Sequence, residues 1–147
     1  CNLAQNAQNQ AAIADPGAAG AGGIEAVVRA MEKHPTSVGV QEQGCRALCN
    51  LAQNARNQAA IAGAGGIVAV VRAMAKHRDP GSVGVQEQGC RALRNLVFNN
   101  AENQVAIAEA RGAVLWAMAR HPTSAVIVCG RAGARLLGVV QPRSCGP

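Results

Sequence analysis

The stretch SVGVQEQGCRAL occurs twice in the chain, at residues 37–48 and again at residues 82–93, without a single difference. An Asn-Leu pair follows each copy, at residues 50–51 and 95–96. The chain opens on CNLAQN, which is identical to residues 49–54 and marks the end of an earlier copy. A unit of about 45 residues that recurs in register is typical of a solenoid. The repetition therefore predicts a stack of similar units.

The duplicated stretch has the spacing of an amphipathic α-helix. Its apolar and small residues fall at i, i+4, i+7, i+8 and i+11, which is one face of a helix. We expect this face to be buried in both copies. Its residues are Val40, Gly44, Ala47, Leu48 and Leu51 in the first copy, and Val85, Gly89, Ala92, Leu93 and Leu96 in the second.

Two small residues in each copy predict details of that helix. Ser37 and Ser82 precede the helical pattern, where a hydroxyl can cap free backbone N–H groups. Gly44 and Gly89 lie inside the helix, where each costs about 1 kcal/mol relative to Ala. A glycine at the same place in both copies indicates that a neighbouring helix approaches closely there.

A second face of the same helix is polar. Its residues are spaced three and four apart, so they lie together on the helix surface. One interpretation is a solvated polar face, and the other is a groove lined by stacked helices. Duplication also copies residues without a role, so identity alone does not decide between the two. The candidate groove residues are Gln43, Arg46 and Asn50, with Gln88, Arg91 and Asn95 as their counterparts.

We expect residues 1–147 to form one domain of successive helical units. The i, i+3, i+4, i+7 spacing of apolar residues over 24–31 and over 67–74 predicts a further helix before each copy. Glycine-rich segments precede both of these helices. The expected boundaries are a truncated helix at 1–6, units at 7–53 and 54–98, a degenerate unit at 99–141 and a tail at 142–147.

Composition favours closely packed helices. Hydrophobic residues make up 49% of the chain, but aromatic residues only 1%, and Ala supplies much of the apolar content. No signal peptide is recognisable, and no apolar stretch is long and uninterrupted enough for a membrane span. We therefore expect an intracellular protein, in the cytoplasm or the nucleus. Because the chain starts inside a unit, we also expect a fragment of a longer solenoid.

The net charge of +6 is unevenly distributed. Residues 1–109 carry nine Lys or Arg and eight Asp or Glu, whereas residues 110–147 carry five Arg and no acid. A basic end could bind nucleic acid, a membrane surface or an acidic protein. Base stacking needs aromatic side chains, and only Phe98 and Trp116 are present. We therefore expect a solubilising or irregular end rather than a site for nucleic acid or membrane.

The cysteines and histidines do not have the spacing of a metal site. Cys45 and Cys90 occupy the same place in the two copies, beside the apolar face, and we expect reduced thiols acting as small apolar residues. His34, His77 and His121 recur once per unit near predicted helix ends, where a cation favours the helix dipole. Helix layers lie about 8–10 Å apart, so these histidines cannot share an ion. We expect no metal, no cofactor and no catalytic centre.

Two phrases of the chain resemble the armadillo repeat family. They are GCRALCNLAQNARNQAAIAGAGGI at residues 44–67 and GCRALRNLVFNNAENQVAIAEARGAV at residues 89–114. The resemblance extends well over residues 1–121 and poorly over 122–140. It implies an all-α, right-handed α-α superhelix with about three helices per repeat, and it implies protein binding rather than a reaction.

In the importin-alpha branch of that family, a Trp and an Asn four residues later line a concave groove. The Asn falls on Asn50 and Asn95 here, but the Trp position holds Arg46 and Arg91. Arg would repel the basic peptides that a Trp ladder holds. We therefore expect a non-catalytic scaffold for a partner protein or an extended peptide that carries acids, with no small-molecule substrate. The alternatives are a structural spacer in a larger protein, or binding of nucleic acid or membrane through the basic C-terminal end.

Overall fold

A computed structural model describes residues 8–10, 22–98 and 100–108 of the chain. Within these residues every regular element is helical and no strand is present, which confirms the all-α expectation. Residues 8–10 are helical as well. The α-helices are α2 (Gly23–Lys33), α3 (Val38–Leu51), α4 (Ala55–Gly63), α5 (Gly66–Lys76), α6 (Val83–Val97) and α7 (Ala101–Ala108), and the 3-10 helix η2 (Pro80–Ser82) precedes α6.

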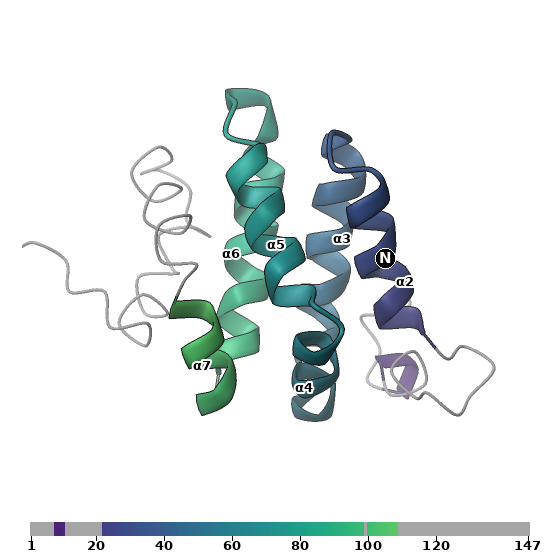
Figure 1. Ribbon diagram of the computed structural model, residues 1–147, viewed down its shortest axis with the longest axis vertical. Coiled ribbons are helices and arrows are strands. Elements are labelled where there is room, and N and C mark those ends of the chain that lie inside the picture. The colour runs from purple at the N-terminus through teal and green to yellow at the C-terminus, as the bar shows by residue number, and fades with distance from the viewer. Residues whose placement is uncertain (1–7, 11–21, 99, 109–147) are drawn as a thin grey trace, which may run out of the picture.

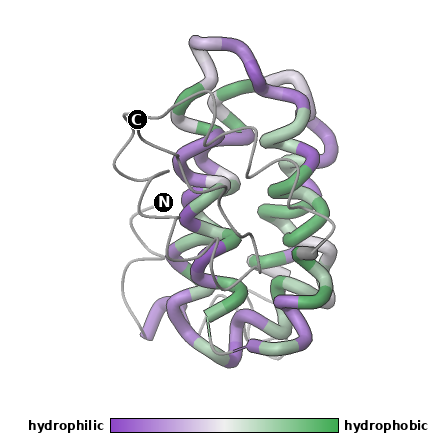
Figure 2. The backbone as a smooth tube through the Cα atoms, turned by 90° about the vertical axis from the view of Figure 1, so that its left-hand side faces the viewer, coloured by the Kyte–Doolittle hydropathy of each residue, from purple (hydrophilic) through white to green (hydrophobic). Residues whose placement is uncertain are grey.

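The helices form two layers (Figure 1). Helices α2 and α5 lie side by side in front, and α3 and α6 lie side by side behind them. Helix α4 continues below α5, and α7 lies below α6 in the same view. Figure 2, in which the molecule is turned by 90°, shows the two layers standing next to each other. The two copies of the duplicated stretch are therefore neighbouring helices, α3 and α6.

The core lies between the two layers and is built mainly from the predicted apolar faces. Leu48, Leu51, Leu93 and Leu96 are almost completely buried. The second copy is the better buried of the two, because Val85 and Ala92 are fully buried whereas Val40 and Ala47 are only half-buried. The other helices add buried side chains to the same core: Ile24, Val28, Met31, Ile61, Ile67, Val70, Met74 and Ile107.

The glycines inside α3 and α6 accommodate methionine side chains. A Cβ atom on Gly44 would lie 2.5 Å from Cγ of Met31, and one on Gly89 would lie 2.6 Å from Cγ of Met74. Each methionine comes from the helix that precedes the glycine in the chain, α2 or α5. The predicted close approach is confirmed, and a side chain of the neighbouring helix makes it.

The turns before α2 and α5 require glycine for a different reason. Gly22 and Gly65 are the N-caps of these helices, with φ of 94° and 79°. Side chains other than glycine rarely adopt this left-handed conformation. The glycine-rich segments of the sequence therefore mark the sharp entry into the second helix of each unit.

Helix capping agrees with the sequence at one of the two predicted serines. The Ser37 hydroxyl accepts a hydrogen bond from the backbone N–H of Val40 at 3.4 Å. The prediction for Ser82 is wrong, because its hydroxyl instead donates to Oδ2 of Asp79 at 2.8 Å. The sequence before the second copy holds the turn residues of η2, and this turn draws the serine away from the helix end. The same hydrogen bond holds the pKa of Asp79 below its usual value.

Buried amide side chains satisfy the carbonyls at helix ends, which have no partner inside their own helix. Gln41 donates through Nε2 to the carbonyls of Met31 (2.8 Å) and His34 (2.9 Å) at the end of α2. Gln86 donates in the same way to Met74 (2.8 Å) and His77 (2.6 Å) at the end of α5. We call this pair of contacts the glutamine clasp.

A second set of amides serves the ends of α3 and α6. Asn57 donates to the carbonyl of Leu51 at 3.1 Å, and Asn103 donates to that of Leu96 at 2.9 Å. Gln58 reaches the carbonyl of Ala52 at 3.2 Å. Each helix end is thus held by an amide from the helix that follows it.

In the described part of the chain, no single helix has both the length and the apolar character needed to cross a membrane. Helices α4 and α5 meet these requirements of length and composition only when taken together, and the pair is bent by 72°. Several sequence expectations lie outside the described residues: the truncated helix at 1–6, most of the degenerate unit at 99–141, the tail at 142–147, the basic end at 110–147, Trp116 and His121.

Candidate functional site

The six predicted groove residues lie on two adjacent helices. Gln43, Arg46 and Asn50 belong to α3, and their counterparts belong to α6. Because α3 and α6 pack side by side (Figure 1), the two rows belong to neighbouring helices. Gln43 and Arg91 are exposed, and the other four residues, Arg46, Asn50, Gln88 and Asn95, are half-buried.

The arginines of this surface are not paired with acids in the part of the chain that the structure describes. Neither Arg46 nor Arg91 makes an ion pair or a hydrogen bond there. Arg94, one turn further along α6, reaches only the side-chain oxygen of Asn95, at 3.4 Å. The α3–α6 surface therefore offers guanidinium groups to an incoming acceptor.

Two arginines of this surface, Arg91 and Arg94, lie near the buried thiol of Cys49. Burial raises the pKa of Cys49 above its ordinary value, and the charges of Arg91 and Arg94 oppose that shift. Both guanidinium groups are therefore close enough to act on the end of α3. Both arginines belong to α6, and their charges reach the end of α3.

Asn95, one of the predicted groove residues, makes hydrogen bonds within the fold. Asn95 donates through Nδ2 to the carbonyl of Cys49 at 3.0 Å and lies 3.5 Å from its Sγ. Its own carbonyl accepts from Nε2 of Gln58 at 3.0 Å. Asn95 thus joins α6 to α3 and α4, and its amide donor is already used. This contact occupies the group that would read a peptide backbone.

Asn50 occupies the equivalent position on α3 but lacks the equivalent contact. Its Nδ2 atom is buried and has no hydrogen-bond partner among the described residues. The counterpart of Cys49 for this side chain is Cys1, because residues 1–6 repeat residues 49–54, and Cys1 lies outside the described residues. The two asparagines are therefore not interchangeable.

The thiols and imidazoles have packing roles. Cys45 and Cys90 are buried free thiols, and burial raises the pKa of each to about 12. His77 is the C-cap residue of α5, and its ring nitrogen Nε2 lies 2.9 Å from the carbonyl of Pro35, in the turn between α2 and α3. His34, the C-cap residue of α2, is exposed. Both histidines stand at helix ends, as the sequence predicts.

Sequence reasoning missed the glutamine clasp, although the sequence contains a signal for it. Gln41 stands three residues before Gly44 and seven before Leu48, so the helical period places it on the buried face. It is 2% exposed, and Gln86 is fully buried. A polar residue on a core face must find hydrogen-bond partners. The helical period therefore predicts hydrogen-bond partners for Gln41 and Gln86, but not for Gln43 and Gln88, which lie on the polar face.

Comparison of the chain with known protein families, with curated proteins and with solved structures found no match. Within the described residues, no three His, Cys, Asp or Glu side chains are arranged to hold a metal ion. The chemistry that the α3–α6 surface offers is charge-assisted hydrogen bonding from Arg46 and Arg91, supplemented by the amide of Gln88. Such donors recognise carboxylates, often through two parallel hydrogen bonds.

Proposed function

We propose that the chain is a non-catalytic protein-binding scaffold that holds an extended segment of a partner protein along α3 and α6. The observation that carries this proposal is the pair Arg46 and Arg91. They stand at equivalent positions of adjacent helices, and neither is neutralised by an acid of the described chain. An unpaired cation repeated on neighbouring helices favours a ligand with acids at a matching interval.

The interval follows from the geometry of helices and of extended peptides. Packed helices lie about 8–10 Å apart, and an extended peptide in the polyproline II conformation advances about 3.1 Å per residue and presents the same face every third residue. A peptide that crosses α3 and then α6 would thus present every third side chain to an arginine. We infer a ligand with Asp or Glu at positions i and i+3. The arginines, rather than the asparagines, supply the specific contacts, because Asn95 already donates to Cys49.

The arrangement of the helices supports an armadillo-type, right-handed superhelix as the wider architecture. Residues 54–98 contain three α-helices, α4, α5 and α6. The third of these lies against its counterpart α3, as stacked units of a solenoid would. Amide contacts such as Gln58 to the carbonyl of Asn95 connect residues 37 positions apart. In such a stack the α3–α6 surface would line the concave side.

The test is a binding titration with synthetic peptides. One peptide carries Asp at every third residue, and a second has the same composition with the acids adjacent. We expect Arg46→Glu with Arg91→Glu to weaken binding of the first peptide at least about tenfold, since charge-assisted hydrogen bonds contribute about 1.5–3 kcal/mol each. The matched control is Arg29→Glu with Arg56→Glu, which reverses two exposed charges on α2 and α4. Circular dichroism checks the fold of every variant.

Four outcomes would contradict the proposal. Equal affinity for the two peptides would remove the argument from helix spacing. Equal losses in the groove variant and the control variant would show only nonspecific attraction. No binding by the wild-type chain would favour a structural spacer. If binding survives the groove variant and falls steeply with salt, the basic end at 110–147 becomes the site.

A further inference from the structure

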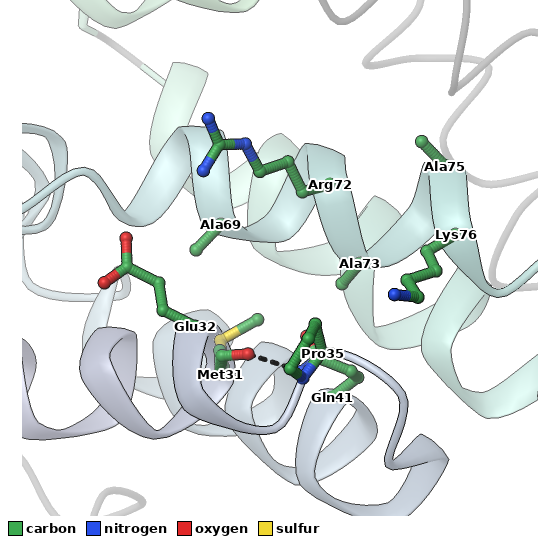
Figure 3. Close-up of a pocket in the computed structure, with 9 residues that line it drawn as sticks. All are labelled: Met31, Glu32, Pro35, Gln41, Ala69, Arg72, Ala73, Ala75 and Lys76. Carbon is green, nitrogen blue, oxygen red and sulfur yellow. Dashed lines mark hydrogen bonds between the residues drawn. The ribbon is translucent and has the colours of Figure 1, made fainter.

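A pocket lies in the front layer of helices, separate from the predicted groove residues on α3 and α6. It lies between α2 and α5 and has a volume of about 530 Å³. Figure 3 shows its walls, which come from α2, from α5, from the turn after α2 and from Gln41 of α3. Small-molecule sites have volumes of about 300–1,000 Å³ and are mostly apolar with a few polar groups. The lining residues are Met31, Glu32, Pro35, Gln41, Ala69, Arg72, Ala73, Ala75 and Lys76.

The floor of the pocket is apolar and preformed. Met31, Ala69 and Ala73 form it, and each is at least nine-tenths buried. Met31 is fixed by its packing against Gly44, and the clasp from Gln41 holds its carbonyl at 2.8 Å. A ligand would therefore meet a surface that needs no rearrangement. Small alanine side chains on α5 leave the space that larger residues would fill.

The rim of the pocket is charged, with cations on α5 and an acid on α2. Lys76 turns its ammonium group toward Pro35 at one end (Figure 3). The carboxylate of Glu32 stands at the other end, on the side of Arg72. Among the described residues none of these three charged groups makes an ion pair or a hydrogen bond. Arg72 lies at the same end of the pocket as the carboxylate of Glu32, whereas the end with Lys76 has no acid among the lining residues.

We propose that this pocket binds a free amphipathic carboxylate of the medium-chain fatty acid class. The carboxylate lies against the ammonium group of Lys76, and the aliphatic chain covers Met31, Ala73 and Ala69. Two cations and one acid leave the rim with one net positive charge, which matches a ligand with a single negative charge. The methylene stems of Arg72 and Glu32 border the chain while their charged ends stay in water. This site is independent of the peptide surface on α3 and α6.

Octanoate is the probe, and the methyl groups of methionine report where it binds. The full chain contains three methionines, so ¹³C-methyl labelling gives a spectrum that is easily assigned by substitution. Octanoate should shift the signal of Met31, which lines the pocket, with a saturable dependence on concentration. Met74 is the internal control, since it occupies the equivalent position on α5 and does not line the pocket.

Matched variants test the charge. Lys76→Gln should weaken octanoate binding about two- to fivefold, as expected for loss of one exposed ion pair. Lys33→Gln is the control, because Lys33 holds the same position at the end of α2 and does not line the pocket. Glu32→Gln should strengthen binding, since it removes a negative charge near the ligand. These side chains are exposed, so we expect the variants to remain folded.

Ligand analogues test the apolar floor. Butanoate lacks four of the methylene groups that the apolar floor would bury, so it should bind at least about tenfold more weakly. Octanol, which lacks the charge, should also bind more weakly than octanoate. The proposal is overturned if octanoate leaves the Met31 signal unchanged, if Met74 shifts equally, or if Lys33→Gln weakens binding as much as Lys76→Gln.

Discussion

The first glutamine of each copy connects a helix of one layer to the end of a helix of the other. In each copy of the duplicated stretch the first glutamine is buried, whereas the second is exposed in the first copy and half-buried in the second. Gln41 and Gln86 donate to backbone carbonyls at the ends of α2 and α5. These carbonyls have no hydrogen-bond partner within α2 or α5 themselves. An unsatisfied buried carbonyl costs about 1–3 kcal/mol. The glutamine is therefore a packing residue in spite of its polarity.

We predict that Gln86→Ala destabilises the protein far more than Gln88→Ala. The first substitution removes the donor to the carbonyls of Met74 and His77 and leaves both buried without it. The expected loss is about 2–4 kcal/mol in the free energy of unfolding, whereas Gln88→Ala should change it by less than about 0.5 kcal/mol. Urea unfolding followed by circular dichroism measures both. Equal effects would mean that the clasp does not stabilise α5 against α6.

The buried thiols predict a loss of stability at alkaline pH. Burial raises the pKa of Cys45 and Cys90 from an ordinary value of 9.0 to about 12. Below pH 9 both the folded and the unfolded states keep these protons, so the thiols have no effect. Above pH 9 the unfolded chain releases them while the folded chain does not, and unfolding becomes more favourable. Each thiol should reduce stability by about 1–2 kcal/mol at pH 10.

Unfolding by urea at several pH values between 8 and 10 measures this dependence. The variant Cys45→Ala with Cys90→Ala is the comparison, because it lacks both titrating groups. It is expected to be less stable at pH 8 but to lose about 3 kcal/mol less between pH 8 and pH 10. Parallel curves for the wild type and the variant would assign the alkaline loss to other groups.

At the scale of the helix, periodicity predicted the elements and their buried faces. The i, i+4, i+7 spacing identified the core side of α3 and α6, and the repeated glycines identified a close contact there. Periodicity does not say which side chain fills the space beside a glycine. Met31 and Met74 were recognised only as members of an apolar face, because contacts between helices depend on how the helices are placed in space.

The pairing of Gly89 with Met74 leads to a prediction about α5 and α6. A Cβ atom at residue 89 would lie 2.6 Å from both Cγ and Sδ of Met74, so one of the two side chains must move. Overpacking costs about 1–3 kcal/mol, and better helix propensity returns about 1 kcal/mol. We expect Gly89→Ala to destabilise the native protein. In a background that carries Met74→Ala, the same substitution should stabilise it.

A double-mutant cycle on thermal stability measures this coupling. The same cycle for Gly44 and Met31 provides a second, independent case, because the geometry is nearly identical. Additive effects in both cycles would show that the glycines are retained for another reason.

At the scale of the molecule, hydrogen bonds connect residues about one unit apart in the chain. Asn95 reaches Cys49, Gln58 reaches Asn95, and His77 contacts Pro35. The sequence indicated that equivalent residues would be neighbours, and it predicted the polar residues of the α3–α6 surface. It did not reveal that Asn95 uses its donor within the fold. The pocket between α2 and α5 was also missed, since its charged residues look like an ordinary solvated helix face.

The shared core predicts that the described helices unfold together. Leu48 of α3 and Leu93 of α6 belong to one buried cluster and are 0% and 2% exposed. Replacing either with Ala should cost about 2–5 kcal/mol of a total stability of about 5–15 kcal/mol. Hydrogen exchange read out by mass spectrometry can follow α3 and α6 separately. We expect Leu93→Ala to accelerate exchange in both helices, and Glu25→Ala, at an exposed position of α2, to leave both unchanged. Faster exchange in α6 alone would mean that each copy of the duplicated stretch unfolds by itself.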